Sequence, residues 1–127
     1  MPDWHFMSVL AGLEIGEPVA VDELAAVYRG QGVGGLAGHD GEQWIVALDG
    51  DVPAETLLHN LYHELAHVKL GHIARRQAGA ISMPVALRAI VARQDAGEEA
   101  HAAAWAEGKL RGMGNWRAIV ERRCAGE

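Results

Sequence analysis

The chain of 127 residues has a single cysteine, Cys124, and little aromatic content. One thiol cannot form an internal disulfide, which excludes a disulfide framework and also a zinc site built from several cysteines. We expect Cys124 to be an incidental thiol near the chain end, because a reactive thiol needs a special environment. Half of the residues are hydrophobic, so a core can form without a structural metal. The length favours one domain spanning residues 1–127.

Long apolar runs are also missing. The apolar stretch at residues 6–13 is short, leads into Glu14 and Glu17, and has no basic residue before it. This pattern is unlike a signal peptide, and no window reaches the roughly 18 apolar residues of a membrane-spanning helix. We therefore expect a soluble, cytoplasmic protein with no membrane partner.

Basic residues are scarce in the first half of the chain. Residues 1–64 contain Arg29 as their only base, whereas the net charge of the whole chain is −6. An acidic balance argues against a nucleic-acid partner. We expect the acidic first half and the basic second half to complement each other. The alternative is a basic partner surface around Arg117, Arg122 and Arg123.

Periodicity and turn residues predict an α+β fold in which helices pack on a small sheet. The run Trp-Ile-Val-Ala-Leu at residues 44–48 is typical of a strand, and Asp-Gly-Asp at 49–51 ends it. As a sheet edge, this strand could pair with an extended substrate backbone. Residues 4–13 have no clean period and predict neither helix nor strand.

The segment before the strand predicts a short helix and then a turn. Residues 22–30 fit a helix with Asp22 as its N-cap and Gly30 at its C-terminal end. The glycine-rich stretch at 30–41 lacks the Gly-Lys-Ser/Thr ending of a phosphate loop. It predicts a flexible turn region that leads into the strand.

A long central helix is expected after the strand. Residues 51–53 supply its N-cap and a proline suited to its first turn. Its apolar pattern continues to between residues 72 and 78, and Gly79 is the expected stop. Two further helical stretches are expected, one from about residue 82 and one over residues 98–105.

The central helix carries His63-Glu64-Leu65-Ala66-His67, a His-Glu-x-x-His motif. Residues four apart share a helix face, so His63 and His67 can aim ring nitrogens at one zinc ion. Glu64 lies beside this pair, where it can take a proton from a metal-activated water without becoming a ligand. The pattern predicts a zinc peptidase with Glu64 as its general base.

A catalytic zinc site usually has three protein ligands and one open position. The third is expected to be a carboxylate from the later helix, where Glu98 and Glu99 are the best candidates and Asp95 and Glu107 weaker ones. Small residues after the pair would let that helix approach the motif helix. A helix-start carboxylate complementing the helix dipole is the other role open to Glu98 or Glu99.

Three other histidines lie near this pattern. His59 is one turn before His63, and we expect it to lie behind the ligands or in solvent. His72 comes one place too early for the third histidine of the pattern His-Glu-x-x-His-x-x-Gly-x-x-His, whose position Ile73 occupies, and with a continuing helix it would point well away from His67. Helix-end packing or a backbone hydrogen bond is its expected role. His101, like Tyr62 and His59, is a candidate contact to substrate or to the ligands.

Residues 56–72, ending in Leu70-Gly71-His72, resemble the motif helix of the ImmA/IrrE-type metallopeptidases. The later run beginning Glu99-Ala100-His101 resembles that family's third-ligand segment, although Asn or Asp is usual where His101 stands. The resemblance covers residues 43–106. It implies a small zincin-like domain with the motif on a central helix, and zinc bound by His63, His67 and Glu99.

The family includes regulators that cleave repressor-type proteins, often in phages, mobile elements or stress circuits. The resemblance therefore implies a zinc-dependent endopeptidase that acts on a specific intracellular protein. The alternative is a zinc-binding interaction module with little or no proteolysis, which the short chain favours. An intact Glu64 argues against that alternative, since a purely structural site needs no base.

Overall fold

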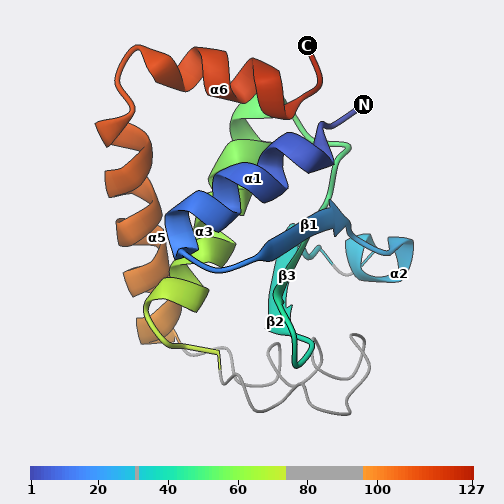
Figure 1. The fold of residues 1–127 in the computed structure, drawn as a ribbon, viewed down its shortest axis with the longest axis vertical. Coiled ribbons are helices and arrows are strands. Elements are labelled where there is room, and N and C mark those ends of the chain that lie inside the picture. Colours follow the sequence, from blue (N-terminus) through green and yellow to red (C-terminus); the bar gives the residue numbers. More distant parts are fainter. Residues whose placement is uncertain (31, 74–95) are drawn as a thin grey trace.

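The computed structural model describes residues 1–30, 32–73 and 96–127, and within them the fold is α+β, as predicted (Figure 1). The elements follow in the order α1 (Trp4–Ile15), β1 (Val19–Glu23), α2 (Ala26–Arg29), β2 (Gly35–His39), β3 (Trp44–Leu48), α3 (Ala54–Lys69), α5 (Ala96–Gly112) and α6 (Trp116–Cys124). The helical stretch expected from about residue 82 lies outside the described residues.

The three strands form one mixed sheet in the order β1-β3-β2. Strand β1 is parallel to β3, with Val21 opposite Val46, and β2 is antiparallel to β3, with Ala37 opposite Val46. The strand predicted at residues 44–48 is confirmed. Its expected place at the sheet edge is wrong, because β3 is paired on both sides. Within the described residues the edges are β1 and β2.

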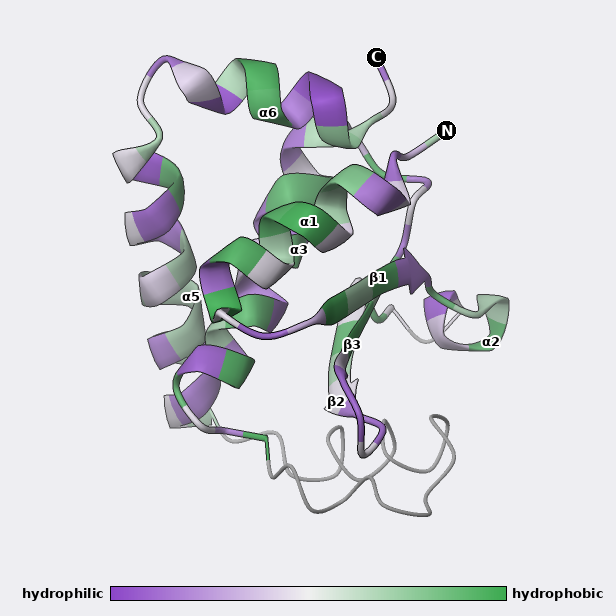
Figure 2. Ribbon diagram, in the orientation of Figure 1, coloured by the Kyte–Doolittle hydropathy of each residue, from purple (hydrophilic) through white to green (hydrophobic). Residues whose placement is uncertain are grey.

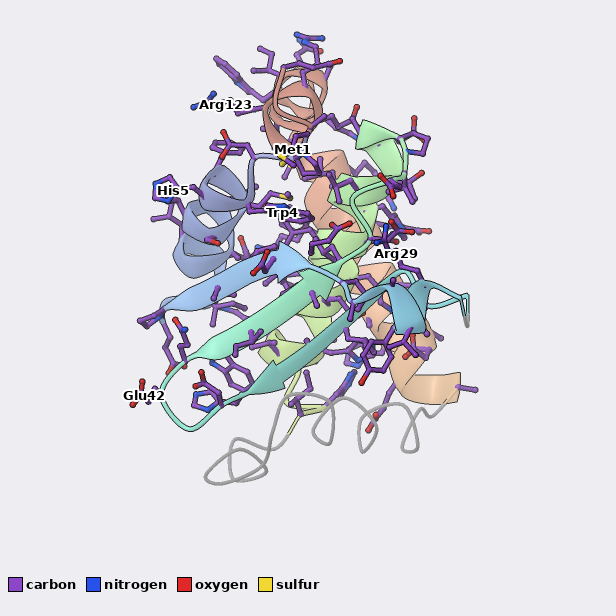
Figure 3. All side chains as sticks on the ribbon, turned by 90° about the vertical axis from the view of Figure 1, so that its right-hand side faces the viewer. Met1, Trp4, His5, Arg29, Glu42 and Arg123 are labelled. Atoms are coloured by element: carbon purple, nitrogen blue, oxygen red, sulfur yellow. The ribbon has the colours of Figure 1, made fainter. Side chains whose placement is uncertain are left out.

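The long helices lie on one side of this sheet, and α3 runs between the sheet and α5 (Figures 1 and 3). In β3 the side chains of Trp44, Val46 and Leu48 are buried, whereas those of Ile45 and Ala47 are partly exposed. This alternation is typical of a strand with one face on the core. Figure 2 shows the hydrophobic residues concentrated in α1 and the strands, whereas α5 is banded with hydrophilic ones.

The apolar segment at the start of the chain is a helix, α1. The Asp3 carboxylate accepts a hydrogen bond of 2.9 Å from the Phe6 N–H, and Gly16 ends the helix with a left-handed φ of 80°. Met7 and Ala11 are buried, but Leu13 on the same helix is largely exposed. Apolar residues therefore occur around the whole helix, which explains why the sequence has no clean helical period.

The helix predicted over residues 22–30 is mostly wrong. Asp22 lies in β1, so it is not an N-cap, and only Ala26–Arg29 is helical. Gly30 does follow the last helical residue, as expected. Parallel pairing with β3 has overridden local helix propensity in the first part of the segment. The glycine-rich stretch is more than a turn, because Gly35–His39 forms β2.

The chain ends lie together, and contacts there join the two halves. The Asp3 N–H donates to the Cys124 carbonyl at 2.8 Å, and Arg123 lies 3.8 Å from the Asp3 carboxylate. Lys109 pairs with Glu14 at 2.8 Å. These ion pairs agree with the expected complementarity between halves. Cys124 is fully buried, and burial raises its pKa to about 12, which fits an unreactive thiol.

In the described ranges, every helix is too short or too polar to span a bilayer.

The acidic group of Glu23, Asp49 and Asp51 surrounds Arg29, whose Nη1 lies 2.7 Å from the Asp51 carboxylate. Its distances to the carboxylates of Glu23 and Asp49 are 3.4 Å and 3.6 Å. Arg29 thus supplies the positive charge that this group needs.

Candidate metal centre

Helix α3 carries the His-Glu-x-x-His motif through the middle of the fold. It begins at Ala54, directly after Pro53. Proline is tolerated at this position because the first N–H groups of a helix have no hydrogen-bond partner within the helix. One side of the helix faces the core. Its buried side chains recur every three or four residues and are those of Leu57, Leu58, Leu61, Leu65 and Val68. Packing of this side fixes the rotation of α3 and thereby the direction of its histidines.

The side chains of His63, His67 and Glu99 converge, as predicted. The Nε2 atoms of the two histidines lie 3.3 Å apart. One Glu99 oxygen lies 2.7 Å from the His63 Nε2, and the other lies 3.2 Å from the His67 Nε2. The three side chains form one group in which a ligand atom of each lies within 4.8 Å of the others.

Close packing of α5 on α3 brings Glu99 to the histidines. Ala102 and Ala106, three and seven residues after Glu99, are fully buried, and α5 packs on α3. A side chain no larger than a methyl group lets the two helix backbones approach each other. Among the small residues expected to allow this approach, Ala102 is buried, whereas Ala100 and Ala104 are exposed.

The three groups fit a zinc ion in donor type and spacing. Two imidazole nitrogens and one carboxylate are a ligand set of catalytic zinc sites, which keep a fourth position open. Zinc bonds of about 2.0–2.1 Å in a tetrahedron separate ligand atoms by roughly 3.3 Å. The separations of 3.3 Å and 3.2 Å to the His67 Nε2 match that spacing, and His63 and Glu99 need to part slightly.

No protein-family model, curated protein or solved structure matches this chain. The centre is therefore inferred from the geometry of its own side chains. Burial lowers the pKa of His67, and His63 and His72 lower it further, while the Glu99 carboxylate acts in the opposite direction. A lowered pKa keeps the ring neutral, which is the form that binds metal.

Glu64 lies next to this centre without joining it. Its side chain is 8 % exposed, and the group that could hold a metal does not include it. Burial, followed by the nearby charge of Glu99, raises the pKa of Glu64 to about 8. A raised pKa means that the carboxyl group holds its proton near neutral pH, and the positive charge of a bound metal ion would lower this pKa and free the group to accept a proton.

Strand β2 passes directly beside Glu64, a feature that the sequence interpretation missed. A Cβ added to Gly35 would lie 3.1 Å from the Glu64 Cγ and 2.9 Å from the Leu48 Cδ2. A Cβ on Gly34 would lie 3.0 Å from the Asn60 Nδ2 on the same helix. The paired glycines let the strand approach α3 closely, and they were the available signal for this contact.

We expect Gly35→Ala to destabilise the protein by about 1–3 kcal/mol, because the added methyl group overpacks the contact between β2 and Glu64. Gly108→Ala is the matched control. Gly108 lies inside α5 with open space around an added Cβ, so alanine there should stabilise by about 0.5–1 kcal/mol. Urea unfolding of both variants measures the difference. Equal effects would show that the close approach at Gly35 is relaxed in solution.

The remaining candidate side chains have different positions. The ring of His59 stacks beside that of His63, with centroids 6.4 Å apart. His101 is exposed, and its ring centroid lies 5.7 Å from that of His72. Tyr62 is buried in the core, where it stacks on Trp105. His59 and His101 thus border the centre, whereas Tyr62 points into the core.

The other acidic candidates are not members of the group formed by the described residues. Glu98 is half-buried in the first turn of α5, one residue before Glu99. Glu107 is eight residues beyond Glu99, or about 12 Å along the helix. Asp95 lies outside the described residues. The geometry therefore favours Glu99 as the third ligand.

Helix α3 ends earlier than predicted, and this changes the place of His72. The last helical residue is Lys69, and Gly71 follows with a left-handed φ of 76°. The chain therefore turns back at Gly71, so the expected stop at Gly79 is wrong. The His72 N–H donates to the His67 carbonyl at 2.9 Å, which confirms the expected backbone hydrogen bond. The predicted direction of its side chain, away from His67, is wrong.

Proposed function

We propose that the protein is a zinc-dependent endopeptidase. The observation that carries this proposal is the convergence of His63, His67 and Glu99 beside a buried Glu64 that stays outside the ligand group. A structural metal site needs ligands only. A proton acceptor held next to three ligands of a four-coordinate ion is the arrangement of a site that activates water.

Zinc, when bound, supplies Lewis acidity that polarises a carbonyl group and lowers the pKa of a water molecule. The residues of the chain supply the rest. His63, His67 and Glu99 hold the ion, and Glu64 takes the proton of the attacking water. Glu64 then delivers this proton to the leaving amine, so that one carboxyl group serves as base and as acid.

An extended substrate would pair with β2. Within the described residues β2 is a sheet edge, and Gly35 at its start lies against Glu64. An edge strand offers unpaired backbone groups to a peptide, which aligns the peptide along the strand. This role replaces the one expected for residues 44–48, which form the central strand.

The resemblance to the ImmA/IrrE-type metallopeptidases supports a zincin-like fold and a specific intracellular regulatory or repressor-type protein as the substrate. The residues that carry the resemblance are the ones that converge in space: His63 and His67 on α3, and Glu99 on α5. The position of β2 beside the motif helix agrees with a peptide-binding edge. Both points support the same reaction class.

We expect protein purified without chelator to contain about one zinc per chain, because three ligands of suitable type lie within reach of one ion. Elemental analysis measures the stoichiometry. The matched control is His5→Ala, which removes an exposed histidine on α1 (Figure 3) that is not a member of the converging group. It should leave the zinc content unchanged, whereas His63→Ala should remove most of it. A wild-type protein that neither contains nor takes up zinc would contradict the proposal.

A further inference from the structure

The turn after α3 carries His72 back onto the helix. The His72 N–H bonds to the His67 carbonyl at 2.9 Å and the Gly71 N–H to the Val68 carbonyl at 3.3 Å. With Gly71 left-handed, these two bonds make a Schellman ending. Such an ending fixes the backbone of the residue after the glycine. The place of His72 is therefore set by the helix that also bears the metal ligands.

This turn brings two imidazole rings into contact. The Nδ1 of His72 lies 2.9 Å from the Nδ1 of His67, and the ring centroids are 5.1 Å apart. The opposite nitrogen of His67, Nε2, lies among His63 and Glu99. His67 is thus held from both ends of its ring. One end faces the ligand group, and the other faces His72.

The chemistry of a ligand settles which nitrogen holds the proton between them. A metal-binding Nε2 carries no proton, so a neutral His67 carries its proton on Nδ1. Two Nδ1 atoms 2.9 Å apart share one proton. The Nδ1 of His67 therefore donates, and the Nδ1 of His72 accepts. Histidine ligands commonly donate to a carboxylate, a carbonyl or water, and the acceptor orients the ring.

We propose that His72 is a positioning residue for the metal centre. By accepting the Nδ1–H of His67, it holds the tautomer and the ring rotation that direct Nε2 toward the ion. This inference rests on the proposed zinc site and extends it to a residue outside the ligand set. It also gives the Leu70-Gly71-His72 ending a role, since the glycine turns the chain and the histidine supplies the acceptor.

The test compares three substitutions at one position. Zinc affinity is measured by competition with a chelator of known affinity. His72→Ala removes the acceptor and should lower zinc affinity by about 10–100-fold. His72→Asn should restore most of it, because the amide oxygen occupies the place of Nδ1 on the ring. His72→Gln puts its amide one atom further out, and it should remain close to alanine. His5→Ala again serves as the control for loss of a histidine.

A second measurement follows the proton itself. In zinc-loaded wild-type protein, the His67 Nδ1–H should give a protected downfield signal in proton–nitrogen spectra. The signal should persist in His72→Asn and disappear in His72→Ala. Thermal unfolding of the metal-free variants shows whether each one folds, and all of them keep the backbone bond from residue 72 to the His67 carbonyl.

The outcomes separate this inference from the proposed function. Wild-type affinity in His72→Ala, or equal restoration by asparagine and glutamine, would overturn the positioning role and leave the zinc site intact. A wild-type protein without zinc affinity would overturn both. Loss of affinity in alanine and glutamine, with recovery in asparagine, is the expected result.

Discussion

Glu64→Gln should lower the rate of peptide cleavage by about 10²–10⁴-fold, the usual contribution of a general base, while zinc remains bound at about one ion per chain. The amide keeps the size of the side chain and loses the ability to accept a proton. Zinc should stay because Glu64 lies outside the group of His63, His67 and Glu99. The Glu64→Gln protein should also fold normally. Burial favours the uncharged form of the Glu64 carboxyl group, and the glutamine amide is likewise uncharged.

The measurement is cleavage of a partner protein during co-expression with products of neighbouring genes. Glu55→Gln is the matched control, because it makes the same substitution on an exposed residue of the first turn of α3. It should cleave at the wild-type rate. Zinc content is determined in the same preparations, so that a loss of the ion is not mistaken for a loss of the base.

Each departure from this result has a specific meaning. Equal cleavage by Glu64→Gln and the wild type would show that Glu64 is not the base. Loss of zinc from the Glu64→Gln protein would show that Glu64 is a metal ligand. Tight binding of a partner by both forms, with cleavage by neither, would favour the zinc-binding interaction module. Zinc content alone cannot separate these functions, since both bind the ion.

Much of the candidate centre could be predicted from sequence because its ligands depend on local geometry. His63 and His67 are one turn apart on a helix, and a helix fixes their relation whatever surrounds it. Glu99 required information of another kind, because the spacing to it crosses more than thirty residues. The resemblance of residues 99–101 to a family segment chose it over Glu98, and the observed packing of α5 on α3 agrees.

The parts that sequence interpretation missed depend on contacts between distant segments. Strand β1 pairs with β3, and β2 gains its conformation from β3 and from the close approach of Gly35 to α3. Neither strand has a strong local pattern, because β1 ends in the polar residues Asp22 and Glu23 and β2 is rich in glycine. The early end of α3 was a different error. Gly71 belongs to the Leu-Gly-His ending, and a glycine directly after the last periodic residue is itself a stop signal for a helix.

Replacing Glu99 should weaken zinc binding far more than the same change at Glu98. Glu99→Ala removes one of the three proposed ligands, so its effect should exceed the roughly 10–100-fold loss typical of residues that only orient a ligand. Glu98→Ala is a close control. It lies one residue earlier in the first turn of α5, so both substitutions remove one negative charge near the helix start. Their shared effect on the helix dipole is worth about 0.3–1 kcal/mol in stability.

The difference between the two variants therefore isolates direct ligation. The oxygens of Glu99 lie 2.7 Å and 3.2 Å from the Nε2 atoms of His63 and His67, and the packing of α5 on α3 holds Glu99 at this position. Glu98 is not a member of this group, as expected for neighbours on a helix, which are rotated by about 100° at 3.6 residues per turn. Chelator competition on both variants measures the two affinities. A larger loss for Glu98→Ala would mean that α5 is rotated in solution so that Glu98 faces the histidines.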